Sequence, residues 1–149
     1  MSPGRPLTAG ERALARAALG PAPSLSRVRL LPLPGLRRAF VAGRWGGSDW
    51  IVWPARTLTP DLSQAPLARQ ALLVHELTHV LQAQGGVSLP VAKLKAGDDA
   101  AAYRYPVHAA CRWGDLNIEQ QAMVIEHRFR AARGQAVPAD SAFYARVRP

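Results

Sequence analysis

The stretch "LLVHELTHVLQAQ", residues 72–84, places two histidines four positions apart, with a glutamate directly after the first. On a helix, residues four apart project from nearly the same face, so His75 and His79 can each offer a ring nitrogen to one metal ion. Glu76 lies about 100° further round the helix axis, which places its carboxylate beside the ion rather than on it. This is the pattern His-Glu-x-x-His, in which the glutamate acts as general base on a water activated by the metal.

A buried helix with histidines in its core is the alternative interpretation, because the same stretch is apolar on most sides. That interpretation accounts for the leucines and valines. It does not account for two histidines and an acid at ligand spacing, since burying three ionisable groups without partners is costly. The chain has only four histidines, so this pattern rarely arises by chance. The sequence therefore predicts a Zn²⁺ site.

A catalytic zinc site needs a third protein ligand and leaves the fourth position for water. Cys111 is the only cysteine, which excludes both a thiolate-rich site and an intrachain disulfide. Beyond Glu76, the remaining glutamates are Glu119 and Glu126, seven residues apart and hence on one face of a predicted helix. A solvated helix face paired with arginines is the alternative role for these two acids. The further candidates for the third ligand are His108, His127, Asp98, Asp99 and Asp115.

Local signals in the first third of the chain predict one helix and a small sheet. Thr8 and Glu11 have the spacing of a capping box, and Gly20 ends the helix that they begin. A short strand over residues 28–31 is ended by prolines, which favour the edge of a sheet. Two further strands flank the turn at residues 46–48.

Two longer helices follow. Pro66 suits the first turn of a helix that runs to Gly85 and contains the histidines. A second helix over residues 117–134 begins at Asn117, a good N-cap. Its 3–4 spacing predicts a buried stripe of Ile118, Ala122, Ile125 and Phe129. The segment 87–115 between the two helices shows no clean periodicity, so loops and short helical turns are expected there.

The overall composition fits one domain over residues 1–149 with a core of its own. The formal charge is +9, but all but two of the 19 basic residues are arginines scattered along the chain. Because no basic-aromatic cluster accompanies the charge, nucleic acid is not the expected partner. No stretch approaches the roughly 20 apolar residues that span a bilayer, and the N-terminus lacks the apolar core of a secretion signal. We therefore expect a cytoplasmic protein without a membrane partner, with non-classical export left open.

The motif "HELTHVLQAQ" followed by "LNIEQQAMVIEHRF" resembles the gluzincin group of zinc metallopeptidases, in which a glutamate on a second helix completes the site. With the opening "LTAGERALARAALG" and the stretch "NIEQQA", most of the chain is similar to small bacterial domains called Vgr-related. Those domains occur beside or fused to contractile secretion systems and Rhs-type toxins. The resemblance implies an α+β, minimal zincin-like metallopeptidase domain with a small twisted sheet, an active-site helix and a second ligand helix.

Carried over to this chain, the resemblance implies that His75, His79 and Glu119 bind zinc and that Glu76 is the catalytic base. One position departs from the larger gluzincins, which place an acid four residues after the ligand glutamate to orient a histidine. Here that position is Met123. The alternatives for the orienting role are Gln120, Gln121 and Glu126.

Peptide hydrolysis also needs a group that stabilises the oxyanion, and zincins commonly use a tyrosine or a histidine. The stretch "AAYRYPV" offers Tyr103 and Tyr105, of which we favour Tyr105, while His108 and His127 are also available. In the family layout an edge strand borders the cleft and pairs with an extended substrate. The stretch "WIVWPA", residues 50–55, is the candidate for that edge.

The leading hypothesis is a zinc-dependent peptidase that acts on a protein or peptide substrate, with a partner in a secretion or toxin system. The second is a non-catalytic, zinc-stabilised adaptor or chaperone-like module that keeps the site for folding. The third is a DNA-associated protease of the SprT type, which would use the +9 charge.

Overall fold

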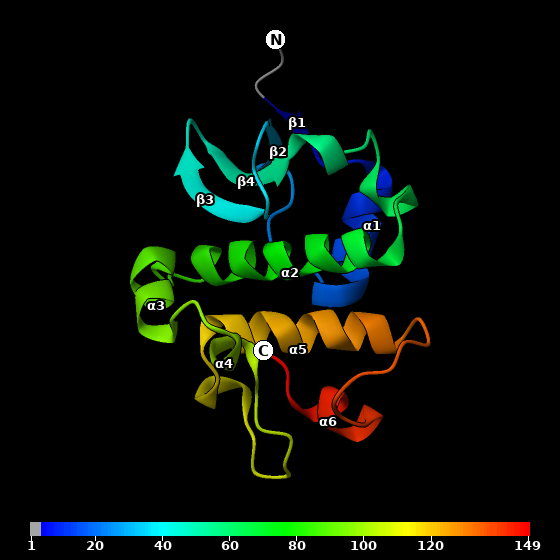
Figure 1. The fold of residues 1–149 in the computed structure, drawn as a ribbon, viewed down its shortest axis with the longest axis vertical. Helices are drawn as coiled ribbons and strands as arrows, with labels where there is room; N and C mark the ends of the chain where they lie inside the picture. Colours follow the sequence, from blue (N-terminus) through cyan, green and yellow to red (C-terminus); the bar gives the residue numbers. More distant parts are fainter. Residues whose placement is uncertain (1–3) are drawn as a thin grey trace.

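A four-stranded mixed sheet lies on one side of a long helix, α2, and further helices lie on the other side (Figure 1). This computed structural model describes residues 4–149. The strands are β1 (Arg5–Pro6), β2 (Val28–Leu33), β3 (Phe40–Trp45) and β4 (Ser48–Pro54). The α-helices are α1 (Ala9–Leu19), α2 (Leu67–Gln84), α3 (Leu89–Ala96), α4 (Ala100–Tyr103), α5 (Ile118–Ala131) and α6 (Ser141–Arg146). Short 3₁₀ turns are η1 (Ala55–Thr57), η2 (Leu62–Gln64) and η3 (Trp113–Asp115). The α+β class is confirmed.

The strand order is β1-β2-β4-β3, with β4 parallel to β2 and antiparallel to β3. The loop over residues 34–39 therefore carries the chain past the position of β4 to the outer edge of the sheet. The prediction that residues 50–55 form the edge strand is wrong, because β4 is central and Ile51 and Trp53 are fully buried. Its apolar run is the pattern of a strand covered on both faces. The strand at the edge next to β4 is β3, and β1 forms the other edge.

Strand β2 was also predicted at an edge, and this too is wrong. Its neighbour on the outer side is β1, which pairs antiparallel with Arg29 and Leu30. A two-residue strand has no periodicity that a sequence pattern can show, so β1 was missed. Strand β1 pairs only with these two residues of β2. Pro32 lies further along β2, where its missing N–H costs no hydrogen bond to β1.

The capped helices form where the sequence predicts them. In α1 the Thr8 side chain accepts from the Glu11 N–H while Glu11 accepts from the Thr8 N–H. Asn117 and Gln120 make the same reciprocal pair at the start of α5. Helix α2 begins after Pro66 and ends at the predicted glycine. The predicted buried stripe of α5 is confirmed at Ile118, Ala122, Ile125 and Phe129.

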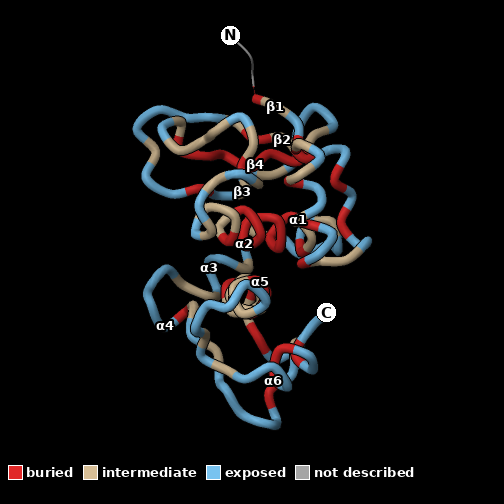
Figure 2. Tube along the Cα trace, turned by 90° about the vertical axis from the view of Figure 1, so that its right-hand side faces the viewer, coloured by how far each residue is buried: buried red, intermediate tan, exposed pale blue. Residues whose placement is uncertain are grey.

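Helix α2 is covered on two sides, because the sheet packs on one and α5 runs antiparallel along the other (Figure 1). Figure 2 shows buried residues gathered in α2 and β4. One apolar cluster joins the sheet to α2 through residues such as Ile51, Trp53 and Leu77, and a second joins α1, α2 and α5 around Val74 and Ile125. The polar side chains of α2 that lie between these layers must therefore find partners within the protein.

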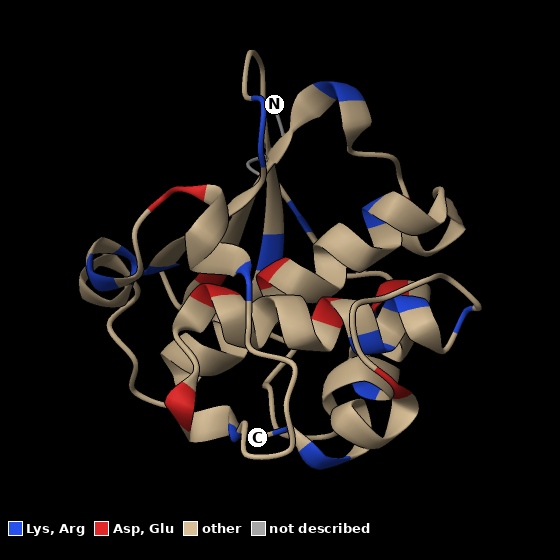
Figure 3. Ribbon diagram, turned by 60° about the horizontal axis from the view of Figure 1, so that its bottom comes forward, with Lys and Arg blue, Asp and Glu red and all other residues tan. Residues whose placement is uncertain are grey.

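Lysines and arginines are spread over strands, loops and helices rather than gathered on one element (Figure 3). This distribution is the one expected from their scatter along the sequence. Within residues 4–149, no helix has the length and apolar character needed to cross a membrane.

Candidate metal centre

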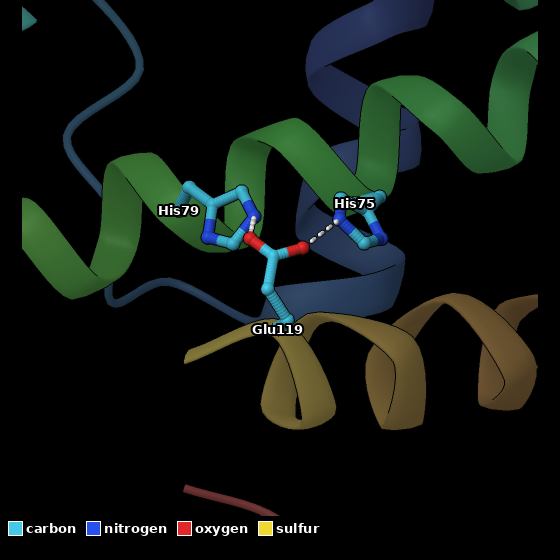
Figure 4. A group of neighbouring side chains, drawn as sticks. All are labelled: His75, His79 and Glu119. Carbon is cyan, nitrogen blue, oxygen red and sulfur yellow. Dashed lines mark ion pairs between the residues drawn. The ribbon is translucent and has the colours of Figure 1, made fainter. Parts of the chain in front are cut away.

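Three side chains from two helices converge between α2 and α5 (Figure 4). His75 and His79 project from α2 toward Glu119 near the start of α5. The Nε2 atom of His79 lies 2.9 Å from one carboxylate oxygen of Glu119, and the Nε2 atom of His75 lies 3.5 Å from the other. All three residues are buried, and their candidate ligand atoms lie within 4.8 Å of one another. The group is therefore close enough to bind one metal ion.

The other nitrogen of each ring is held by a different acceptor. His75 Nδ1 lies 3.1 Å from Glu126 Oε1, and His79 Nδ1 lies 2.8 Å from Gln82 Oε1. An ionised carboxylate and an amide oxygen can only accept, so the Nδ1 atoms carry the protons in these contacts. In a neutral ring the lone pair is then on Nε2, on the side of Glu119, and this is the form of histidine that binds a metal.

If both rings were neutral, these lone pairs would face the Glu119 carboxylate, so the arrangement needs a positive charge, either a metal ion or a proton on a ring. Burial acts to lower the pKa of His75, but Glu119 and Glu126 outweigh it and raise the pKa to about 9. Burial likewise opposes ionisation of Glu119, yet hydrogen bonds with His75 and His79 hold its pKa well below the ordinary range. In the metal-free protein a proton on His75 supplies the positive charge. Two imidazoles and one carboxylate are a donor set that suits zinc, so the residues fit the expected ion.

Both acceptors are themselves fixed. The Gln82 amide donates to the Ile118 carbonyl and to Gln121 Oε1, each at 3.0 Å. Arg130 Nε donates to the second oxygen of Glu126 at 2.9 Å. These contacts lock the orientation of each ring, because neither acceptor can turn away without losing its own partner.

Among the three residues considered for the orienting role, Glu126 contacts His75 and Gln121 supports Gln82, whereas Gln120 caps α5. Gln82 itself was missed. Its signal was present, because residues three apart on a helix are neighbours and Gln82 follows His79 at that spacing. A glutamine on a helix is too common for the spacing alone to have singled it out.

Glu76 differs from the other two acids of the centre. Its side chain is buried and lines the cavity beside His75 and His79. Among residues 4–149, no hydrogen bond or ion pair engages its carboxylate, whereas Glu119 and Glu126 are both engaged. Burial raises the pKa of Glu76, which the neighbouring histidines oppose. A carboxylate without a partner and with a raised pKa is well suited to take a proton from water.

A cavity of about 820 Å³ opens onto this centre. One wall is the segment 36–43, which includes the start of β3. The other wall comes from α2, α5 and the helix α3, with Leu89, Pro90 and Lys93. Since β3 pairs only with β4, its other edge is free of strand partners in the described part of the chain. The candidate metal centre therefore lies at the base of a cleft, and the edge of β3 that borders this cleft has no strand partner among residues 4–149.

The two tyrosines considered for the oxyanion, Tyr103 and Tyr105, lie in different places. The Tyr105 hydroxyl lies 2.6 Å from both His127 Nδ1 and the Tyr144 hydroxyl, and its ring packs in the cluster beneath α5. It does not line the cavity. Tyr103 does line the cavity, and its ring centroid lies 6.4 Å from that of His75. Burial and the Glu119 carboxylate raise the pKa of Tyr103, while Arg38 opposes the rise.

The other candidate ligands do not join the three-residue group. Asp99 caps α4 and Asp115 contacts Arg112. His108 is exposed, and its ring accepts a hydrogen bond from the Ala110 N–H. Asp98 lies on the exposed rim of the cavity.

No protein-family model matches the sequence. The chain is similar to the type VI secretion system spike protein VgrG2b of Pseudomonas aeruginosa, with 30% identity over 141 residues. This similarity covers 85% of the chain but only 13% of the length of that protein. The fold is similar to the solved effector domain of Pseudomonas aeruginosa VgrG2b, with a TM-score of 0.70 and 31% identity. That likeness covers 88% of this chain and 76% of the solved domain.

Proposed function

This chain belongs to the family of the VgrG2b effector domain, and from that premise we propose that it is a zinc-dependent peptidase of a type VI secretion system. The observation that carries the proposal is the convergence of His75, His79 and Glu119 beside an acid, Glu76, whose carboxylate has no hydrogen-bond or ion-pair partner among residues 4–149. The family relation supports the link to secretion. The site supports metal-assisted hydrolysis, since it combines a ligand set with a free general base.

A bound zinc ion would supply Lewis-acid activation of a water and of the scissile carbonyl. His75, His79 and Glu119 would hold it, with Glu126 and Gln82 keeping the rings in place. Glu76 takes the proton from the attacking water and passes it to the leaving nitrogen as the C–N bond breaks. Its raised pKa favours that second transfer.

We propose Tyr103, rather than Tyr105, as the donor to the oxyanion. Its side chain lines the cavity beside His75 and Glu119. A neutral hydroxyl is needed for donation, and burial together with Glu119 keeps the Tyr103 pKa above its ordinary value. Tyr105 has both sides of its hydroxyl occupied by His127 and Tyr144.

The substrate in this proposal is an extended peptide segment that pairs with the free edge of β3. Backbone pairing with an exposed strand edge binds a chain irrespective of its side chains. The register of β3 against β4 shifts between Val41 and Gly43, next to the cavity. Bulges of this kind re-aim nearby side chains at the edge of a sheet.

The sequence feature that favoured a non-catalytic adaptor was the absence of an acid four residues after Glu119. Glu126 contacts His75 instead, so the orienting acid comes from the next turns of the same helix. The scattered arginines likewise offer no basic stripe for the DNA-associated alternative.

The substitution Glu76→Gln tests the proposal. It keeps the size of the side chain and removes the base, so zinc content stays at the wild-type level while cleavage falls by about 10²-fold or more. Cleavage is measured by mass spectrometry on a proteome-derived peptide mixture, beside zinc content by elemental analysis. Asp115→Asn, an exposed acid outside the cavity, is the matched control. Equal cleavage by Glu76→Gln and wild type would refute the proposed mechanism.

A further inference from the structure

We propose that the cleft selects peptide substrates carrying an aspartate or glutamate close to the scissile bond. This inference rests on the proposed peptidase function and adds a substrate class to it. It is carried by the charges that line the two walls of the cavity.

Three cations line the cavity outside the metal centre. Arg37 and Arg38 come from the loop between β2 and β3, and Lys93 comes from α3 on the opposite wall. All three are exposed. A peptide lying along β3 therefore passes between cationic side chains on either side.

No acid of the described chain contacts these cations directly, although the charge of Lys93 acts at longer range on the buried Glu76 and acts to lower its pKa. Among residues 4–149, Arg37, Arg38 and Lys93 make no ion pair within 4.0 Å, although other arginines such as Arg5, Arg44 and Arg130 do. Burying such a group beneath a neutral substrate would cost desolvation with no compensating charge. A substrate carboxylate supplies that charge.

The acids that line the cavity do not neutralise these three cations. Glu119 and Glu126 are engaged by the histidines, and Glu126 also pairs with Arg130. Glu76 lies buried at the base of the cavity rather than on its rim. Asp98 is the remaining acid of the lining, and it contacts none of the three cations within 4.0 Å. The rim outside the metal centre thus carries three positive charges against one negative charge.

A second hollow extends the basic wall. It adjoins the main cavity and shares Leu36 and Arg37 with it. Arg56, which follows β4, completes its charged lining. A peptide that extends past the loop over residues 34–39 therefore meets a further arginine and no acid.

The test uses two fluorescein-labelled decapeptides that differ only at two positions flanking the centre, with glutamate in one and glutamine in the other. Binding is measured by fluorescence anisotropy on the zinc-loaded Glu76→Gln protein, so the result does not depend on cleavage. In parallel, the wild type is incubated with the peptide mixture and its cleavage sites are mapped. The double variant Arg37→Gln/Lys93→Gln is compared with Arg69→Gln/Arg148→Gln, which removes the same charge outside the cavity.

We expect the glutamate peptide to bind about tenfold more tightly than the glutamine peptide at low salt, and the ratio to shrink as salt rises. The ratio should fall toward one in Arg37→Gln/Lys93→Gln and persist in the control. Equal binding of the two peptides would overturn the inference. So would a preference that survives undiminished in Arg37→Gln/Lys93→Gln, because these two cations would then not bind the carboxylate. An acid preference in binding without any cleavage would instead uphold the inference and refute the proposed activity.

Discussion

The two histidines of the metal centre differ in what holds their second ring nitrogen. His75 contacts a carboxylate, whereas His79 contacts the neutral amide of Gln82. An anionic acceptor strengthens the basicity of the ring more than an amide does. The raised pKa of His75, about 9, follows from its two carboxylate neighbours, which outweigh the lowering by burial. Charge at this centre is therefore controlled chiefly through His75.

Replacing Glu126 should weaken metal binding without removing a ligand. Glu126→Gln keeps a hydrogen-bond acceptor near His75 Nδ1 but loses the charge, and it also loses the ion pair with Arg130. We expect zinc affinity to fall about 10- to 100-fold, the range typical for residues that orient a metal ligand. Competition with a chromophoric chelator measures the affinity, with Asp115→Asn as the matched control. An unchanged affinity would show that Glu126 does not act on His75.

Zinc binding should release a proton at pH 7.5. With a pKa of about 9, His75 is protonated in the metal-free protein, and it must lose that proton to become a ligand. Affinity should therefore rise about tenfold per pH unit up to pH 9. Because the pKa of His75 is higher in the folded than in the unfolded state, its protonation also stabilises the metal-free fold. This stabilisation is fully present below the unfolded pKa of 6.5 and is lost as the pH rises through about 9.

Calorimetry in two buffers with different ionisation enthalpies counts the released protons. About one proton per zinc is expected, whereas a histidine with its ordinary pKa would release about one tenth of a proton at pH 7.5. Release near that smaller value would contradict the coupling of His75 to Glu119 and Glu126.

Among the secondary-structure elements, the features set by local sequence could be predicted, whereas the features set by long-range contacts could not. The capping boxes of α1 and α5 depend on residues three apart, so the sequence predicts both helix starts. The position of β4 at the centre of the sheet depends on the route of the loop over residues 34–39, which no local pattern encodes. The position of Tyr103 in the cavity likewise depends on how the aperiodic segment 87–115 folds back on α5.

Glu11 shows how a local cap also serves a long-range contact. Its carboxylate is fully buried and accepts from both terminal nitrogens of Arg5, at 2.7 and 2.9 Å. It also accepts from the Thr8 N–H and, 51 residues away, from the Leu62 N–H, both at 2.8 Å. The cap therefore ties β1 and α1 to η2, ahead of the start of α2.

Glu11→Ala should lower the free energy of unfolding by about 3 to 5 kcal/mol, because it leaves the buried Leu62 N–H without an acceptor and the Arg5 guanidinium without its carboxylate partner. Urea unfolding of the zinc-loaded protein measures the change. The exposed control Asp115→Asn should cost less than about 1 kcal/mol. A loss as small as the control's would mean that the buried contacts of Glu11 contribute little.

For the whole molecule, the decisive feature is that α2 lies between the sheet and α5. This arrangement buries the ligands on one side and leaves Glu76 facing the cleft beneath the edge of β3. The sequence showed the histidine pair and the two candidate acids, Glu119 and Glu126, since each pair follows from the spacing of its residues on one helix. Which acid meets both histidines depends on the antiparallel register of α2 and α5. Beforehand, Glu119 was favoured over Glu126 by the resemblance and by its position at the start of the helix, next to the core residue Ile118. The single-domain assignment to residues 1–149 stays a prediction.

The most direct measurement is zinc content by elemental analysis of protein purified without exposure to an affinity-column metal, in the wild type and in Glu119→Gln. Circular dichroism shows whether each protein is folded. We expect one zinc per chain in the wild type and little or none in the folded Glu119→Gln variant, because that change removes the only anionic ligand of the group. A zinc-free wild type after reconstitution, or a variant that keeps a full zinc complement, would contradict the assignment of His75, His79 and Glu119 as zinc ligands.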